Sequence, residues 1–190
     1  MKTYQVLHEH DPSVDIRDCL DVSRRFFSEY DVSEIKPVVL PDFVYSDIIG
    51  RSYGRACDSG RLEHYLKMTG VPDSILILRH PLLADEFSGI PFNIFLALGT
   101  AIERTYAVVS AFGMGTGGLA QTRAAKVLAH EMAHVVVGID DGCCQEQRCI
   151  MYNSPVPYVE MPDRVLKVLD GKSGWCDFHS LLLFGPSGRI

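Results

Sequence analysis

Two histidines and a glutamate are the residues of this sequence best suited to chemistry. They read His130-Glu131-Met132-Ala133-His134. On a helix, a rotation of about 100° per residue places His130, Glu131 and His134 within one arc. Imidazoles at positions i and i+4 can bind one zinc ion, and the carboxylate can take a proton from water that the zinc activates. The simpler interpretation is a solvent-facing helix with two incidental histidines, and the residues that follow favour the zinc site.

The segment after this motif is rich in turns and cysteines. Gly138 could end the helix in a left-handed cap and let the chain turn back toward the metal with a third ligand. Beyond it the sequence contains Cys143-Cys144, Cys149-Ile150-Met151 and Trp175-Cys176-Asp177-Phe178-His179. Cysteines clustered in this way bind metal more often than they form disulfides when the protein is cytosolic.

These motifs resemble the archaemetzincins, a branch of the metzincin zinc metallopeptidases. The family pattern is His-Glu-x-x-His-x-x-Gly-x-x-His-Cys-x4-Cys-x-Met, followed by a Cys-x-x-Cys pair. His130, Glu131 and His134 match its start, and the stretch from Cys144 to Met151 matches its middle. The final pair is similar to Cys176-x-x-His179, with histidine in place of the last cysteine.

The resemblance implies two zinc sites. In the catalytic site, His130 and His134 would hold the zinc, Glu131 would activate the zinc-bound water, and Met151 would be the Met-turn residue beneath the metal. The residues implied for the structural zinc are Cys144, Cys149, Cys176 and His179. Their types agree with a closed tetrahedral Cys3His site. The alternative is a set of buried free thiols with a surface histidine, and a disulfide fits the cytosolic setting less well.

The third ligand of the catalytic zinc is the point at which this sequence departs from the family. Where the family has glycine, three residues after the second histidine, this chain has Val137, and its glycine follows at 138. Counted from the helix, the third-ligand position is Asp140, which is our preferred ligand because aspartate can bind zinc. Counted back from Cys144, the position is Cys143. Asp141 and the absence of any third ligand are the remaining alternatives.

Composition limits the classes of partner. The chain has 190 residues, and 24 acidic side chains outnumber 18 basic ones, for a formal charge of -6. Nucleic acid is an unsuitable partner because phosphate binding needs a surplus of lysine and arginine. No signal peptide and no stretch of about 18 apolar residues is visible, so we expect a cytoplasmic protein without a membrane partner. The composition says nothing of oligomeric state.

The elements that must position these residues alternate between strands and helices. We expect one metalloprotease-like domain over 1–190, in which 1–137 form the part that ends in the active-site helix and 138–190 form a part with the structural zinc. Expected strands are 2–7, 35–40, 74–78, 93–99 and 106–112, and expected helices are 14–30, 61–68 and 122–137. This order predicts a mixed α/β fold. The resemblance implies a twisted, mostly parallel sheet with one antiparallel edge strand, packed on helices, and a turn-rich, zinc-stapled C-terminal region.

The function that the resemblance implies is hydrolysis of peptide bonds by a zinc metallopeptidase acting on small peptides, in an aminopeptidase-like reaction. In the family, a strand antiparallel to its neighbours borders the cleft, and 106–112 is either that strand, with which an extended peptide could pair, or an ordinary strand of the sheet. The alternative is a non-catalytic or weakly active zinc protein that retains only the structural zinc and binds peptides or proteins. Cys19 and Cys57 have no expected role. We expect His8, His10, His64 and His80 to be surface or hydrogen-bonded residues.

Overall fold

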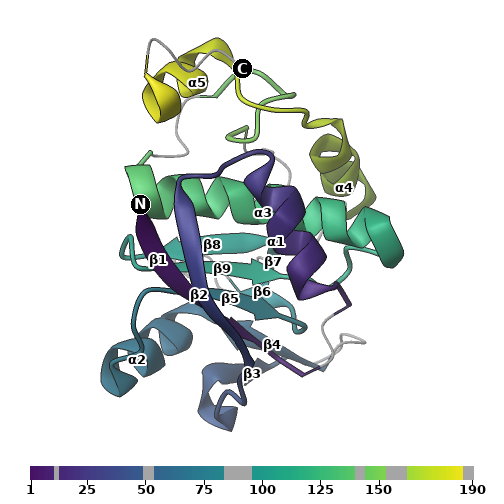
Figure 1. Ribbon diagram of the computed structural model, residues 1–190. Helices are drawn as coiled ribbons and strands as arrows, with labels where there is room; N and C mark the ends of the chain where they lie inside the picture. The colour runs from purple at the N-terminus through teal and green to yellow at the C-terminus, as the bar shows by residue number, and fades with distance from the viewer. Residues whose placement is uncertain (11–12, 49–53, 84–95, 140–143, 153–161, 186–190) are drawn as a thin grey trace.

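Figure 1 shows two β sheets with helices on both sides, in a computed structural model that describes residues 1–10, 13–48, 54–83, 96–139, 144–152 and 162–185. The strands are β1 Lys2–His8, β2 Tyr30–Pro37, β3 Tyr45–Asp47, β4 Arg55–Asp58, β5 Ser74–Leu78, β6 Leu82–Leu83, β7 Leu96–Ala97, β8 Gly99–Ile102 and β9 Tyr106–Ser110. The helices are α1 Ile16–Arg24, α2 Ser59–Thr69, α3 Gly117–Val137, α4 Pro162–Gly171 and α5 Asp177–Phe184, with a short 3-10 turn at Asp42–Val44.

The larger sheet, sheet A, has the strand order β2-β1-β5-β9-β8. Its first four strands are parallel, and β8 pairs antiparallel with β9, with Gly99 opposite Val109. All five residues of β5 are buried, as expected for a strand covered on both faces. The predicted mixed α/β fold, with a mostly parallel sheet and one antiparallel edge strand, is confirmed.

Of the two alternatives for 106–112, the structure shows the ordinary strand of the sheet. Strand β9, within the predicted 106–112, lies between β5 and β8 and forms hydrogen bonds with both. A peptide therefore cannot pair with it, and 106–112 is not the antiparallel strand that borders the cleft. The antiparallel strand at the border is β8, which belongs to a short hairpin that begins where the predicted strand 93–99 ends. Residues 93–95 lie outside the described residues.

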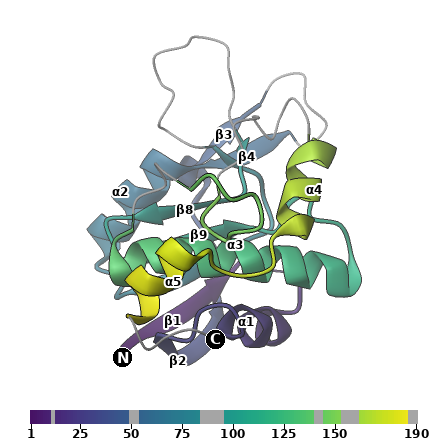
Figure 2. The same cartoon turned by 90° about the horizontal axis from the view of Figure 1, so that it is seen from above.

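Alternating side chains of sheet A build a core on each face. Tyr4, Val6, Ile75 and Ile77 pack with α1 and α3, whereas Leu7, Leu76 and Leu78 pack with α2 and with the smaller sheet B, of order β3-β4-β6-β7. Figures 1 and 2 show α4 and α5 along α3, on the side of α3 away from sheet A. Among the described residues, no helix is both long and apolar enough to cross a membrane.

All three predicted helices have different bounds in the structure, and α2, Ser59–Thr69, differs least from its predicted range of 61–68. Helix α1 starts after Asp15, whose side chain accepts a hydrogen bond from the Asp18 N–H, and it ends at Arg24 rather than at residue 30. The apolar pattern continues beyond Arg24 because Phe27 stacks on Tyr30 in the core, and Tyr30 already belongs to β2. Helix α3 begins five residues before the predicted start, at Gly117. The strand predicted at 35–40 corresponds to β2, Tyr30–Pro37, which lies at an edge of sheet A.

Candidate metal centre

Helix α3 carries the three residues of the candidate catalytic site. Its sheet-facing side is apolar and buried, through Ala124, Leu128, Met132 and Val135. The motif histidines point elsewhere, because their rings contact backbone carbonyls of the segment that follows the helix. One side of α3 therefore anchors the helix in the core, and another side presents His130 and His134 to the C-terminal region.

The two histidine rings have hydrogen-bond partners that set their tautomers. His130 Nδ1 lies 2.9 Å from the Ile150 carbonyl oxygen, and His134 Nδ1 contacts the Ile139 carbonyl oxygen. A carbonyl only accepts, so each Nδ1 donates, and in the neutral rings each Nε2 carries a lone pair. The two Nε2 atoms lie 3.0 Å apart. Such facing lone pairs favour a bound cation, and a backbone carbonyl on the far nitrogen is typical of metal-binding histidines.

The spacing of these nitrogens fits zinc. Zinc–nitrogen bonds of about 2.0–2.1 Å at a tetrahedral angle place two ligating nitrogens about 3.3 Å apart. The ligand atoms of His130, Glu131 and His134 lie within 4.8 Å of one another. The structure thus brings the predicted motif residues together in an arrangement that a metal can occupy.

The Glu131 carboxylate lies against the edge strand β8. Glu131 is 6% exposed. A methyl group at Gly99 would lie 2.6 Å from Glu131 Oε1 and 2.7 Å from Val127 Cγ1, both far inside normal contact distance. The glycine therefore makes room for the carboxylate beside the strand. Nothing in the sequence singles out Gly99, because the contact joins residues of two distant elements.

The chain turns back at the end of α3 as the sequence predicted. Gly138 has φ 75° and ψ 35°, and its N–H donates to the carbonyls of Ala133 and His134. Ile139 then packs beside Cys149 and Met151 in a small buried cluster. The predicted third ligand Asp140, and the alternatives Asp141 and Cys143, lie outside the described residues. The third ligand therefore stays a prediction.

The four predicted ligands of the structural zinc converge. Cys144 Sγ lies 4.0 Å from Cys176 Sγ, and His179 Nδ1 lies 3.0 Å from Cys176 Sγ and 3.6 Å from Cys149 Sγ. Zinc–sulfur bonds of about 2.3 Å at a tetrahedral angle place two sulfurs about 3.8 Å apart. A disulfide needs about 2.05 Å between sulfurs, so Cys144 and Cys176 are not bonded. The geometry suits one closed metal site, which we call the Cys3His cluster.

Burial affects every ionisable group of the Cys3His cluster. It raises the pKa of the Cys144, Cys149 and Cys176 thiols above their ordinary values. Burial also lowers the pKa of His179, and the nearby His130 lowers it further. A metal at the cluster would therefore displace protons from thiols, as thiolate coordination requires. The two candidate metal sites are neighbours, because His130 Nδ1 contacts the carbonyl of Ile150, the residue that directly follows Cys149 of the cluster.

The structure separates these residues from the other cysteines and histidines. Cys19 and Cys57 are buried in apolar clusters, where burial raises the pKa of Cys19 to about 12 and raises the pKa of Cys57 as well. His80 is a hydrogen-bonded residue as expected, because its Nδ1 lies 2.8 Å from a Glu9 carboxylate oxygen. Met151 is fully buried beside Cys149 and Ile139, and its place beneath a catalytic metal stays a prediction.

This chain is similar to known proteins in its structure. No family model and no curated protein matches it. Among solved structures, an archaemetzincin from Methanopyrus kandleri matches with 21% identity and a TM-score of 0.67, over 96% of this chain and 93% of that chain. An archaemetzincin from Archaeoglobus fulgidus, complexed with malonate, matches with 19% identity and a TM-score of 0.64, over 96% and 99%. The chain has an archaemetzincin-like fold.

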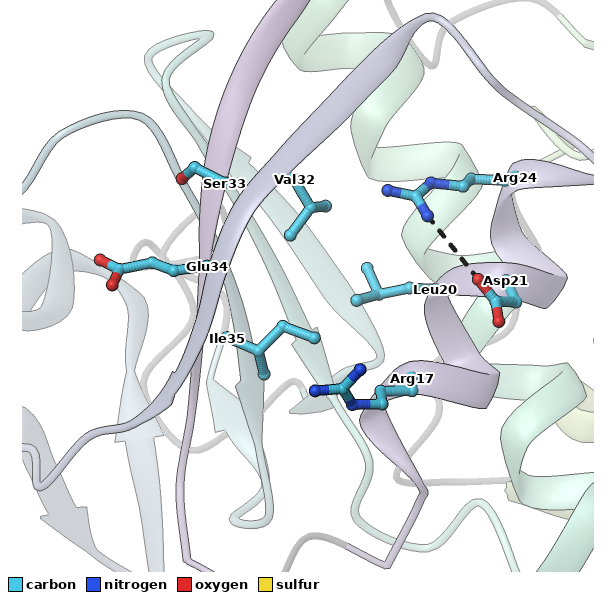
Figure 3. Close-up of a pocket in the computed structure, with 8 residues that line it drawn as sticks. All are labelled: Arg17, Leu20, Asp21, Arg24, Val32, Ser33, Glu34 and Ile35. Carbon is cyan, nitrogen blue, oxygen red and sulfur yellow. Dashed lines mark ion pairs between the residues drawn. The ribbon is translucent and has the colours of Figure 1, made fainter.

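The archaemetzincin-like fold places the candidate chemistry on one side of α3. Sheet A and α1 pack on the apolar side of this helix, and the Cys3His cluster lies beyond the motif histidines. A pocket of about 350 Å³ elsewhere, between α1 and β2, is lined by Leu20, Val32, Ile35 and two arginines (Figure 3). None of the motif or cluster residues lines this pocket. The candidate active site at His130, Glu131 and His134 is therefore separate from this pocket.

Proposed function

We propose that this chain is a zinc-dependent metallopeptidase that hydrolyses peptide bonds of small peptides, in an aminopeptidase-like reaction. The observation that carries the proposal is the pair of Nε2 atoms 3.0 Å apart, each in a ring whose Nδ1 faces a backbone carbonyl. The Glu131 carboxylate on the same helix turn adds a base. The choice of small peptides rests on the resemblance of the motifs in 130–179 to the archaemetzincins.

His130 and His134 would hold the catalytic zinc, with Asp140 as the proposed third ligand. A zinc ion bound there supplies a Lewis acid that polarises a peptide carbonyl and lowers the pKa of water toward about 7. The two histidines keep their protons on Nδ1, and each Nδ1–H donates a hydrogen bond to a backbone carbonyl, that of Ile150 for His130 and that of Ile139 for His134. Both rings thereby stay oriented while substrate enters and product leaves.

Glu131 is the proposed general base and acid. Its carboxylate would accept a proton from the attacking water and pass that proton to the leaving amine. The carboxylate lies against β8, the edge strand of sheet A, where Gly99 leaves room for it. An extended peptide that paired with β8 would therefore run past the base, and backbone hydrogen bonds would hold it.

A non-catalytic or weakly active zinc protein is the second candidate. The observation that favours it is the altered segment after His134, in which Val137 and Cys143 replace the family's glycine and third histidine. Two imidazoles without a third protein ligand would bind zinc weakly. In that case the Cys3His cluster would hold the single firmly bound zinc, and the surface beside β8 would bind peptides or proteins without cleaving them.

Three variants distinguish the two candidates by metal content and activity together. Native mass spectrometry counts bound zinc, and a library of fluorogenic peptides with free or blocked N-termini measures hydrolysis. For the enzyme, we expect two zinc ions in the wild type, one in His130→Ala, and two in Glu131→Gln with turnover reduced about 100-fold or more. His64→Ala, on the exposed side of α2, is the matched control and should match the wild type. One zinc in the wild type, unchanged in His130→Ala, would exclude the catalytic proposal.

A further inference from the structure

The carbonyl oxygen of Ile150 accepts two hydrogen bonds. One comes from His130 Nδ1 at 2.9 Å, and the other comes from Lys172 Nζ at 2.7 Å. A carbonyl oxygen has two lone pairs, so these donors use its full capacity. Lys172 is 9% exposed, which is unusual for a lysine. A buried lysine and a candidate zinc ligand therefore share one backbone atom.

The segment around Lys172 is paired with the segment around Ile150. The Ser173 N–H donates to the Arg148 carbonyl at 2.9 Å, and the Ile150 N–H donates to the Gly174 carbonyl at 2.7 Å. A parallel bridge joins Cys149 and Gly174. Lys172 thus reaches from one paired segment to the other, and its side chain donates to the carbonyl of Ile150, the residue whose N–H already donates to the opposite segment.

The same two segments carry ligands of the Cys3His cluster. Cys149 precedes Ile150 directly, and Cys176 follows Gly174 by two residues, with its N–H donating to Cys149 Sγ at 3.4 Å. A metal in the cluster would hold both segments together. The position of the Ile150 carbonyl, and with it the ring of His130, therefore depends on the cluster and on Lys172.

His134 differs from His130 in this respect. Its Nδ1 contacts the Ile139 carbonyl, just beyond the cap of its own helix. The Gly138 N–H fixes that turn through the carbonyls of Ala133 and His134, and the Ile139 side chain packs beside Cys149 and Met151. The hydrogen bond of His134 is thus made within the turn that follows its own helix, whereas the hydrogen bond of His130 is made to the C-terminal segments.

We propose that Lys172 is a positioning residue that fixes the Ile150 carbonyl and the tautomer of His130, and that it thereby couples the metal affinity of the histidine site to filling of the Cys3His cluster. The proposal rests on the proposed function insofar as His130 is taken as a zinc ligand. Hydrogen-bond partners of metal-binding histidines commonly change metal affinity 10- to 100-fold when they are removed. Lys172 acts one step further out, so we expect about a 10-fold effect.

The test compares Lys172→Met with Lys126→Met. Lys126 is a matched control because it is also a buried lysine that donates to backbone carbonyls, and its acceptors are Leu169 and Asp170 rather than Ile150. Nitrogen NMR of the imidazoles, recorded with only the Cys3His cluster filled, reports the His130 tautomer. Zinc competition titration reports the affinity of the second site.

In Lys172→Met we expect the His130 Nδ1–H signal to become a mixture of tautomers and the second zinc to bind about 10-fold more weakly. We expect Lys126→Met to change neither, even if both variants lose similar stability. An unchanged His130 signal in Lys172→Met, or an equal change in Lys126→Met, would overturn the proposal. The tautomer is read before any second zinc is added, so a failed peptidase proposal would leave this result interpretable.

The wild type supplies a second measurement if Lys172→Met does not fold. When one zinc equivalent fills the Cys3His cluster, the His130 Nδ1–H signal should sharpen as the Ile150 carbonyl becomes fixed, while the His134 signal changes less. If the His130 signal does not respond to filling of the cluster, the coupling is absent and the proposal is wrong.

Discussion

The sheet region and the C-terminal region of this molecule are held together by different interactions. Sheet A is covered on both faces by buried apolar side chains from α1, α2, α3 and sheet B. Helix α5 instead exposes Phe178 by 60%, Leu181 by 54% and Leu182 by 48%, while Leu183 and Phe184 are partly buried against the core and His179 is its buried residue. The first region thus depends on the hydrophobic effect, whereas α5 is held by a candidate metal ligand together with two partly buried apolar side chains.

The largest expected effect concerns the zinc of the Cys3His cluster. In small zinc domains, a structural zinc contributes on the order of 10 kcal/mol to folding. We expect a chelator, or Cys149→Ala, to remove hydrogen-exchange protection from 144–152 and 177–184 while β5 and β9 remain protected. Hydrogen-exchange mass spectrometry with and without zinc measures this directly.

Cys57→Ala is the control for this prediction. Cys57 is fully buried and Cys149 is nearly so, but Cys57 lies in the apolar cluster around sheet B. Its loss should weaken the whole fold slightly and leave zinc content unchanged. If chelation instead unfolds both regions at once, the two regions form one cooperative unit and the contrast between them fails.

The same contrast explains what the sequence could predict. Strand 74–78 and helix 122–137 were predictable because burial imposes a continuous apolar run or a helical period. The residues of the Cys3His cluster were predictable because their motifs resemble the archaemetzincin pattern, and their types suit a closed zinc site. The motif histidines and the cap at Gly138 were visible for similar local reasons.

The parts that sequence reasoning missed depend on backbone atoms or on distant contacts. The β8–β9 hairpin turns through Glu103 and Arg104, both with positive φ, where glycine or asparagine would be the usual signal. The strands of sheet B are two to four residues long, too short for any periodicity. Every residue has a backbone carbonyl, so residue type does not mark those of Ile150 and Ile139. Their role as acceptors is visible only in the folded structure.

A core substitution in α3 should affect the sheet region and spare the metal sites. Leu128 is fully buried between α3 and sheet A. Leu128→Ala removes buried methyl groups and leaves a cavity, so we expect the free energy of unfolding to fall by about 2–5 kcal/mol. Urea unfolding measures the loss, and native mass spectrometry checks that zinc content is unchanged.

Leu119→Ala on the same helix is the matched control, because Leu119 is 53% exposed. A substitution at such a position usually changes stability by less than about 0.5 kcal/mol. A loss of zinc in Leu128→Ala at unchanged stability would show that the core of α3 serves the metal site rather than the sheet.

Glu9 is a polar exception within the sheet region, and it predicts the smallest and most pH-dependent effect. It is 5% exposed at the end of β1, and its carboxylate accepts hydrogen bonds from Tyr45 Oη, from the His80 ring and from the N–H groups of Arg79 and His80. Burial alone would raise the pKa of Glu9, but the bonds from Tyr45 and His80 outweigh burial and lower it. The charged form is therefore the one that the fold stabilises.

The direction of the pH effect follows from that lowered pKa. A carboxyl with a lower pKa in the folded than in the unfolded chain contributes stability above the unfolded value of about 4.3, and the contribution disappears as pH falls through the folded pKa. Glu9→Gln should lower stability near neutral pH by about 1–3 kcal/mol, since donors to the carboxylate lose a charged partner. Its difference from the wild type should then shrink as pH falls from about 6 to about 3.

Urea unfolding at several pH values measures this difference, with the exposed Glu34→Gln as control. Parallel stability curves for the wild type and Glu9→Gln across this range would mean that Glu9 is not the charged acceptor that its contacts indicate. A converging difference would show that even the apolar sheet region depends on one ionised group, which joins the end of β1 to sheet B through Tyr45. Both regions would then depend on polar interactions. They would differ in how many such interactions hold them and in whether these are hydrogen bonds or metal ligands.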